Sequence, residues 1–243
     1  MVRALRPLMR AAGAWLCGAA AAFAAPAPAS ASARTPFQIR CEDTISKTVS
    51  VLSAKTNGFT INNQIPYRGL TARSGSAAGN MATLGLTVTQ GQYSARIGGP
   101  ILQDQASGYE CIAPQVEVKL TYSPVKIYVA SEFPPGTCAY DVILAHEQRH
   151  LQAYMDNLAR VEKVVRDALS KRFGDKPLYA ASGTALGQLQ NEVNGVWFPF
   201  IRDEFEKGKA VQDKIDAPEE YARLGKECGG EIARVVQRRR SGK

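Results

Sequence analysis

The chain lacks several features that define large classes of proteins. After residue 25 it has no apolar run near the roughly 20 residues of a membrane span, so we expect no integral membrane segment in the mature protein. No internal repeat is evident, which argues against a solenoid. The net charge of +8 is too modest for a typical nucleic-acid-binding protein. Because the chain has only two histidines, a metal site built from three histidines is excluded.

The first 33 residues have the composition of an export signal. Arg3, Arg6 and Arg10 form a basic start, and an apolar run rich in alanine follows over residues 11–25. Ala-x-Ala sequences behind this run offer sites for a signal peptidase. We interpret residues 1–33 as a signal peptide that is removed, and we expect a periplasmic or secreted protein.

The cysteines support an oxidising location. Cys17 lies within the signal peptide, so an even number of the 5 cysteines remains in the mature chain. Such a count is typical of disulfides, and three pairings are possible. We favour Cys41–Cys111 and Cys138–Cys228, because each pair would close one half of the chain on itself.

Two patterns of apolar residues predict an α+β fold. From 37 to 129, short β-branched and aromatic segments are separated by turn sequences. From about 139 to 169, apolar residues recur every three or four positions, and a second helical region is expected over about 185–215 with a kink near Gly195–Pro199. We therefore predict an N-terminal antiparallel β-rich lobe at 34–130, followed by a helical lobe at 131–243. The second lobe would contain a helical hairpin and end in a basic tail, and disulfides would stabilise the whole.

The segment His-Glu-Gln-Arg-His, residues 146–150, lies on the first predicted helix. His146 and His150 are one helical turn apart, so both imidazoles project from one face and can hold one metal ion. They lie on the inward stripe, where unpaired imidazoles would be costly. In the mechanism that this spacing serves, Glu147 does not bind the metal but takes a proton from water as a general base. Histidines satisfied by neighbouring carbonyls or carboxylates are the structural alternative.

These residues resemble the zincin metallopeptidases over roughly 125–154, and more loosely a group of secreted zinc-dependent proteases of bacteria. The resemblance implies Zn²⁺ as cofactor, a protein or peptide as substrate, and an edge strand before the helix, at Val-Lys-Ile-Tyr-Val-Ala (125–130), where substrate adds as another strand. Arg149 departs from the pattern, because zincins usually have an uncharged residue there. The longer pattern with a third histidine is absent.

A third ligand must then be a carboxylate, as in zincins that take a glutamate from a second helix. If the turn of the hairpin centres near Lys176, the residue level with His150 lies near position 202, so Glu204 fits best. Other candidates are Glu192, Glu206, Asp213 and Asp216.

A peptidase would also need a hydrogen-bond donor for the developing oxyanion. Tyr221 is our candidate for this role, whereas Tyr154 fits core packing better. The leading hypothesis is thus an exported zinc metallopeptidase. The alternatives are a non-catalytic envelope binding or structural protein stabilised by zinc, and a metal-free structural protein whose histidines belong to the core.

Overall fold

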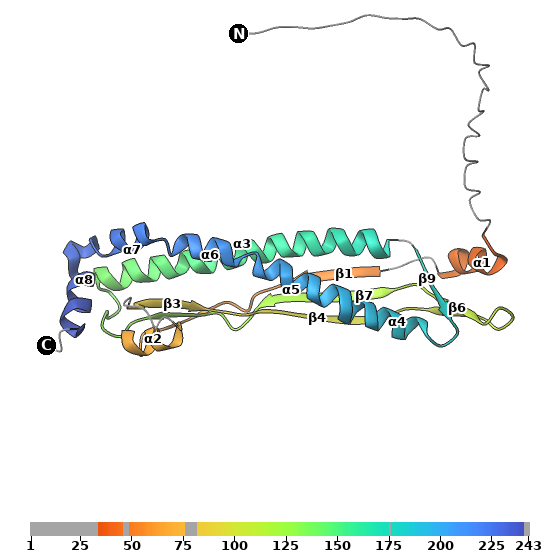
Figure 1. The fold of residues 1–243 in the computed structure, drawn as a ribbon, viewed down its shortest axis with the longest axis horizontal. Helices are drawn as coiled ribbons and strands as arrows, with labels where there is room; N and C mark the ends of the chain where they lie inside the picture. The colour runs from red at the N-terminus through yellow and green to blue at the C-terminus, as the bar shows by residue number, and fades with distance from the viewer. Residues whose placement is uncertain (1–33, 46–48, 76–81, 175, 241–243) are drawn as a thin grey trace, which may run out of the picture. The chain divides into compact units, whose positions relative to one another are not determined.

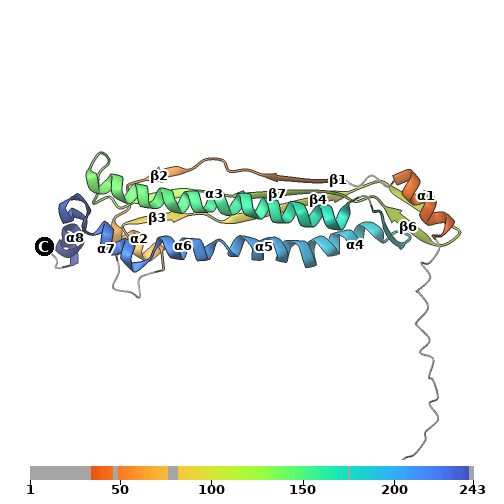
Figure 2. The same ribbon diagram turned by 90° about the horizontal axis from the view of Figure 1, so that it is seen from above.

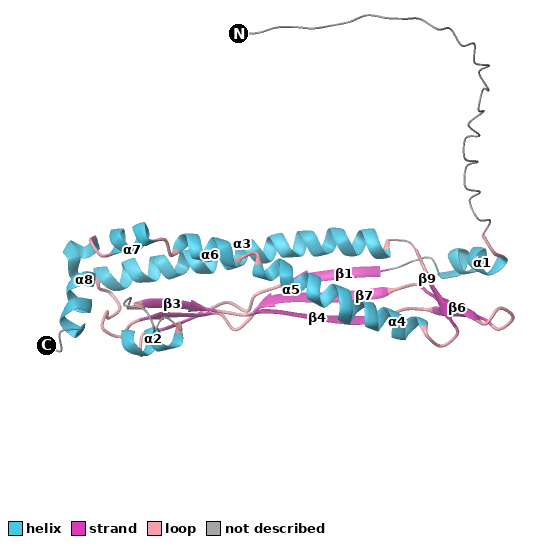
Figure 3. Ribbon diagram, viewed as in Figure 1, coloured by secondary structure: helices cyan, strands magenta, loops and turns pink. Residues whose placement is uncertain are grey.

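The structure, a computed structural model, describes residues 34–45, 49–75, 82–174 and 176–240, and the predicted signal peptide lies outside them. The first half is rich in strands (Figure 1) and comprises α1 (Pro36–Ile45), β1 (Val49–Ala54), β2 (Thr60–Asn62), α2 (Tyr67–Arg73), β3 (Gly85–Val88), β4 (Gly91–Gly98), β5 (Ile101–Asp104), β6 (Tyr109–Ile112), β7 (Gln115–Tyr122) and β8 (Lys126–Val129). The second half is mostly helical (Figure 3) and comprises α3 (Cys138–Phe173), β9 (Leu178–Ala181), α4 (Ala185–Glu192), the π-helical turn η2 (Val193–Trp197), α5 (Phe198–Glu206), α6 (Lys209–Ile215), α7 (Pro218–Leu224) and α8 (Glu227–Arg240). This order confirms the predicted α+β class.

The strands form three-stranded sheets with the orders β1-β7-β4, β2-β8-β3 and β5-β6-β9. The pairs β1·β7 and β2·β8 are parallel, whereas β4·β7, β3·β8, β5·β6 and β6·β9 are antiparallel. The β-rich half is therefore mixed and not purely antiparallel as the sequence suggested. The parallel pairs arise because β1 and β2 come early in the chain and join strands that follow much later.

Strand β8 corrects the expectation of an edge strand at 125–130. It lies in the middle of its sheet, between β2 and β3. Ile127, Tyr128 and Val129 are all buried, although neighbouring side chains of a strand point to opposite faces. Both faces of β8 are thus covered. In the described chain β3 pairs only with β8, so β3 is the edge strand beside the helix that carries the histidines.

Helix α3 packs against the strands along its apolar face. The side-chain oxygen of Thr137 accepts a hydrogen bond from the backbone N–H of Tyr140 and caps the first turn. Val161, Val165 and Leu169 are buried in a core that also includes residues of β1, β7, α4 and α5. The two halves of the chain therefore share a core, and the described residues from Thr35 onward belong to one compact unit. No helix among the described residues is long and apolar enough to cross a membrane.

The second helical region runs back along α3, as Figure 2 shows. An irregular turn lies where a kink was predicted, near Gly195–Pro199: the π-helical turn η2 joins α4 to α5, and Pro199 lies in the first turn of α5. Strand β9 was not predicted. It lies between α3 and α4 and pairs with β6.

Both favoured disulfides are confirmed. Cys41–Cys111 links α1 to β6, and Cys138–Cys228 links the first residue of α3 to α8. Helix α8 is interrupted at Cys228, Gly229 and Gly230, which have positive φ angles of 55°, 62° and 78°. The chain turns at these residues before its last helical segment.

Candidate functional site

The three residues of the His-Glu-x-x-His segment lie on one buried face of α3. His146, Glu147 and His150 are only 5%, 4% and 8% exposed. The Nε2 atoms of His146 and His150 lie 3.2 Å apart. The helical spacing therefore brings the two imidazoles together, as the sequence predicted.

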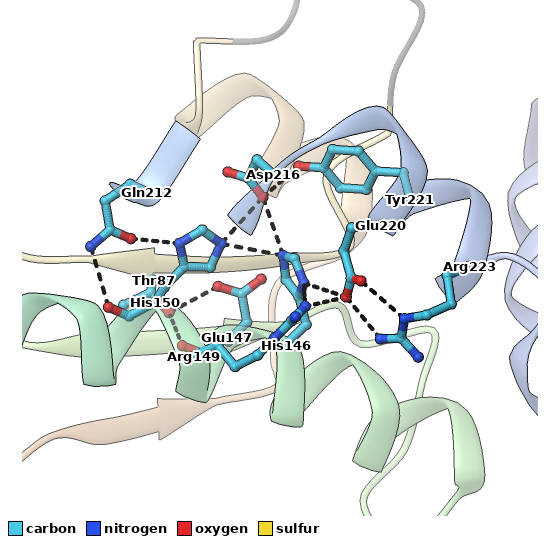
Figure 4. Close-up of polar contacts among 10 residues, drawn as sticks. All are labelled: Thr87, His146, Glu147, Arg149, His150, Gln212, Asp216, Glu220, Tyr221 and Arg223. Atoms are coloured by element: carbon cyan, nitrogen blue, oxygen red, sulfur yellow. Dashed lines mark hydrogen bonds and ion pairs between the residues drawn. The ribbon is translucent and has the colours of Figure 1, made fainter. Parts of the chain in front are cut away.

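Asp216, at the C-terminal end of α6, completes a group of three donors (Figure 4). Its Oδ1 lies 3.2 Å from Nε2 of His146 and 3.2 Å from Nε2 of His150. With the 3.2 Å between the two nitrogens, the three atoms form a nearly equilateral triangle. In a tetrahedral zinc site with bonds of about 2.0–2.1 Å, neighbouring donor atoms lie about 3.3–3.4 Å apart. The spacing of the three donors therefore fits such a metal ion.

The outer nitrogens of both imidazoles contact polar side chains. Nδ1 of His150 lies 2.6 Å from Oε1 of Gln212, which fixes the proton on Nδ1 and leaves the lone pair on Nε2. Nδ1 of His146 has two polar neighbours: Oε1 of Glu220 at 3.4 Å, which could accept a proton from it, and Nη2 of Arg149 at 2.8 Å, which can only donate. The lone pair on Nε2 of His150 then faces Oδ1 of Asp216 at 3.2 Å, and two such atoms repel each other unless a proton or a cation lies between them.

Glu220 connects His146 to two arginines. Its carboxylate contacts Arg149 and accepts hydrogen bonds from Arg223 at 2.8 and 2.9 Å. Arg223, together with Arg149, holds the pKa of Glu220 at about 2, so this group is ionised. Nη2 of Arg149 also lies 2.8 Å from Nδ1 of His146, so Arg149 and Glu220 compete for that nitrogen.

Tyr221 lies beside the donor group, on α7. Its hydroxyl donates to Oδ1 of Asp216 at 2.7 Å, and its ring centroid is 6.1 Å from that of His146. Burial by itself would raise the pKa of Asp216, but contacts with His146, His150 and Tyr221 outweigh it and lower that pKa. Burial and the hydrogen bond to Asp216 raise the pKa of Tyr221, so its hydroxyl keeps its proton.

Glu147 lies against the edge strand β3. Oγ1 of Thr87 is 2.8 Å from Oε2 of Glu147 and 3.0 Å from its backbone oxygen. A Cβ atom on Gly85 would lie 2.8 Å from both Cγ and Cδ of Glu147, so only glycine leaves room for this side chain. Burial raises the pKa of the Glu147 carboxyl, whereas a cation held by the neighbouring donors would act in the opposite direction.

The site opens into a cavity of about 570 Å³. Residues 82–87, which include the start of β3, form one wall, and residues of α3, α6, α7 and α8 form the others. Cavities of this size hold small ligands or a few residues of a peptide. The two histidines and Glu147 are therefore buried, whereas the side chain of Asp216 is 43% exposed, and all four line this cavity.

Glu204, the ligand favoured from the sequence, lies away from the histidines. Its carboxylate forms ion pairs with Arg160, at 2.7 Å, and with Lys207. These cations lower the pKa of Glu204 and explain why a carboxylate can be 5% exposed on an inward stripe. The hairpin estimate counted equal numbers of residues on either side of a turn near Lys176, but β9 and its flanking loops separate the end of α3 at Phe173 from the start of α4 at Ala185. The residues that face His150 consequently come later in the chain.

The remaining carboxylates proposed as ligands also lie outside the donor group. Glu192 pairs with Arg172, Asp213 pairs with Lys209, and Glu206 is exposed on α5. Tyr154 packs on Tyr122 with ring centroids 5.0 Å apart, as expected for core packing, and also lines the cavity. The sequence reasoning missed Gln212, Glu220, Thr87 and Gly85. The only sequence feature that could have indicated Glu220 is its position next to Tyr221.

The comparisons with known proteins found no match: no family model, no curated protein and no solved structure is similar to this chain.

Proposed function

We propose that this protein is a zinc-dependent peptidase in which His146, His150 and Asp216 hold the metal ion. The observation that carries this proposal is the triangle of donor atoms with sides of 3.2 Å, beside the buried carboxylate of Glu147. Two imidazole nitrogens and one carboxylate oxygen are a donor set typical of catalytic zinc sites. A zinc ion bound there would acidify water and polarise a peptide carbonyl.

The residues of the chain have separate roles in this proposal. Glu147 accepts the proton of the attacking water and passes it to the leaving amine. Thr87 holds the Glu147 carboxylate by its hydrogen bond of 2.8 Å. Tyr221, whose hydroxyl keeps its proton, donates a hydrogen bond to the developing oxyanion. For that role the hydroxyl must leave Asp216, to which it donates in this structure.

Strand β3 supports a peptide as the substrate. One of its edges pairs with β8, and no described strand pairs with the other edge. Its residues Gly85, Leu86 and Thr87 line the cavity, as Glu147 does. An extended peptide can add to such an edge through main-chain hydrogen bonds, which would hold its carbonyl groups near the donors.

The cavity favours a catalytic ion over a purely structural one. Structural zinc sites are usually closed by four protein ligands, whereas catalytic sites keep one position open. The described residues supply three donors, and these donors line a cavity of about 570 Å³. The disulfides fit an oxidising compartment, and we infer that the enzyme acts in the periplasm or outside the cell.

Elemental mass spectrometry of the purified oxidised protein tests the metal site. We expect about one zinc ion per chain by the ligand count, lost in His146→Ala and kept in Glu147→Gln. Hydrolysis of an unstructured protein such as casein should be lost in both variants. A protein that binds no zinc after equilibration with the ion would disprove the proposal, and zinc binding without hydrolysis would leave only a structural role for the metal.

A further inference from the structure

A second hollow of the surface lies between α3 and the junction of α5 with α6, and we call it the cationic groove. Its volume is about 560 Å³. One wall is the stripe of α3 from Arg149 to Arg160. The other wall consists of Lys207, which follows α5, and Val211 of α6. No described residue lines both this groove and the cavity beside the donor group, so the two are separate features of the molecule.

At one end of the cationic groove two cations share one carboxylate. Arg160 and Lys207 both form an ion pair with Glu204. The side chain of Glu204 is only 7% exposed, whereas those of Arg160 and Lys207 are 39% and 62% exposed. The carboxylate thus lies beneath the two cations and can neutralise only one of their two charges. This end of the groove consequently presents an excess of positive charge to solvent.

The same arrangement recurs at the other end of the groove. Arg149 shares the carboxylate of Glu220 with Arg223, and the side chain of Glu220 is 13% exposed against 47% for Arg149. Arg149 and Arg160 are eleven positions apart on α3, which corresponds to about 16 Å along the helix axis. Asp156 is the single acid among the described residues that line the groove. The groove therefore has two positive ends about three helical turns apart.

The groove is apolar between its two ends. Ala153, one turn after Arg149, lines it together with Val211. Val211 is 48% exposed on α6, a helix that buries no residue. The fold itself therefore leaves this valine in water, and an apolar group bound in the groove would cover it.

We propose that the cationic groove binds an extended acidic segment of a partner protein, with a carboxylate at each end and an apolar side chain between them. Arginine clusters are a common means of recognising acidic peptide motifs. An extended chain rises about 3.3 Å per residue, so acidic residues about five positions apart would span the groove. An anionic polysaccharide could satisfy the two positive ends, but it has no apolar side chain to cover Val211, so the groove favours a peptide. The inference does not depend on catalysis at the metal site.

Binding of two matched peptides tests the proposal. The probe is a short fluorescent peptide with two glutamates about five positions apart and a leucine between them, and its twin has glutamine in place of both glutamates. Fluorescence anisotropy with the oxidised Glu147→Gln variant, which lacks the proposed general base, gives the two Kd values without cleavage of the probe. We expect the acidic peptide to bind about tenfold more tightly at low ionic strength, and the difference to shrink as salt is added.

Charge reversal in the groove should remove this preference. Lys207→Glu replaces a cation of the wall by an acid, so the Kd of the acidic peptide should rise about tenfold while that of its twin stays the same. Lys119→Glu is the matched control, because Lys119 is 55% exposed on β7, pairs with an acid and does not line the groove. It changes the net charge of the chain by the same amount and should leave both Kd values unchanged.

A second variant covers the case in which loss of the ion pair between Lys207 and Glu204 destabilises the protein. Val211→Glu places a negative charge in the groove without breaking an ion pair, and its side chain is already exposed. It should also raise the Kd of the acidic peptide about tenfold. Val196→Glu is its control, because Val196 is 60% exposed on η2 and does not line the groove.

The outcomes separate this inference from the proposed function. A preference for the acidic peptide that the groove variants weaken and the controls retain supports the inference, even if the protein cleaves no peptide, a result that would count against the peptidase alone. Equal affinity for the two peptides, failure to bind either, or equal losses in the controls would overturn it. Binding of dextran sulfate that depends on Lys207, without binding of the acidic peptide, would overturn it in favour of a polysaccharide.

Discussion

Removal of the disulfide Cys138–Cys228 should weaken the metal site more than it weakens the fold. Gln212, Asp216 and Glu220 lie on a segment that we call the C-terminal arm, residues 209–237. This arm is weakly anchored by apolar contacts: α6 buries no residue, α7 buries only Leu224, and Ile232 is the buried hydrophobic residue of α8 among those described. The disulfide is therefore a major link between the arm and the helix that carries the histidines.

The size of the effect follows from the length of the closed loop. The two cysteines are 90 positions apart, and a cross-link over such a loop contributes about 4–5 kcal/mol by the chain-entropy estimate. When only the arm undocks, the flexible loop is the roughly 20 residues between Gly208 and Cys228, for which the same estimate gives about 3 kcal/mol, or about a hundredfold in the docking equilibrium of the arm. Chains whose arm is undocked lack Asp216 as a ligand, so the apparent zinc affinity falls with the fraction of chains that remain docked. We expect the zinc Kd to rise about tenfold to a hundredfold.

The assay compares two double variants. Cys138→Ala/Cys228→Ala removes the disulfide of the arm, and Cys41→Ala/Cys111→Ala removes a cross-link over 70 positions that joins α1 to β6. The chain-entropy estimate for the second loop is also about 4–5 kcal/mol, so it is a matched control for stability. Zinc Kd from competition with a chelator, and amide hydrogen exchange of α6 and α7, are measured for both. An unchanged Kd and unchanged protection of the arm in the first variant would refute the reasoning, as would equal losses of zinc affinity in both.

Three further changes should have separate effects. In Gly85→Ala the new methyl group would lie 2.8 Å from Cγ and Cδ of Glu147; displacement of this base should lower the rate of hydrolysis by about tenfold to a hundredfold without loss of zinc. Gly98→Ala, where nothing lies within 4 Å, is its control, and an equal loss of rate there would contradict the explanation. Glu220→Gln should raise the zinc Kd, measured by chelator titration, about tenfold, because it weakens the partner of His146. Glu219 is exposed, and Glu219→Gln should leave the zinc Kd unchanged in the same titration. Glu110 is 1% exposed and accepts a hydrogen bond from the backbone N–H of Ala185 at 2.7 Å, and such bonds lower its pKa. The ionised carboxylate therefore stabilises the fold fully above the pKa that Glu110 has in the unfolded chain. This stabilisation is lost as the pH falls through the lower pKa of the folded protein. Urea unfolding should therefore give Glu110→Gln a deficit of about 1–3 kcal/mol at neutral pH that shrinks in acid, and a deficit independent of pH would count against this assignment.

The sequence predicted the parts of the fold that depend on local patterns. The apolar stripe of α3, the interruption near Gly195–Pro199 and the change from strands to helices each follow from residues close together in the chain. The parallel pairing of β1 with β7 does not, because it joins segments more than sixty positions apart. Helix α1 was missed for a different reason: its ten residues show only a weak apolar stripe, and Phe37 and Cys41 are its buried residues.

The candidate site likewise contains residues that a local pattern predicts and residues whose position depends on the rest of the chain. His146, Glu147 and His150 could be predicted because an α-helix alone fixes their spacing. Tyr221 was also named from the sequence, and it lies beside Asp216. Asp216 was one of several possible ligands, because its position depends on how many residues the chain uses between α3 and α6. That number includes β9, the π-helical turn and the break at Gly208, and each of them shifts the register of the hairpin.

Because the position of Asp216 depends on the register of the hairpin, the arm needs a covalent link to α3. A helix that packs along its whole length fixes its own register through many apolar contacts, as α5 does with Ile201 and Phe205. Helix α6 buries no residue and cannot fix the height of Asp216 in this way. The disulfide at Cys138 fixes one end of the arm, and Asn157 fixes the chain just before the other end by donating a hydrogen bond to the backbone oxygen of Phe205 at 3.1 Å. Between these two points the arm meets His146 and His150 through polar groups and the ring of Tyr221, so a metal ion that binds both histidines and Asp216 would supply an attachment that apolar packing does not.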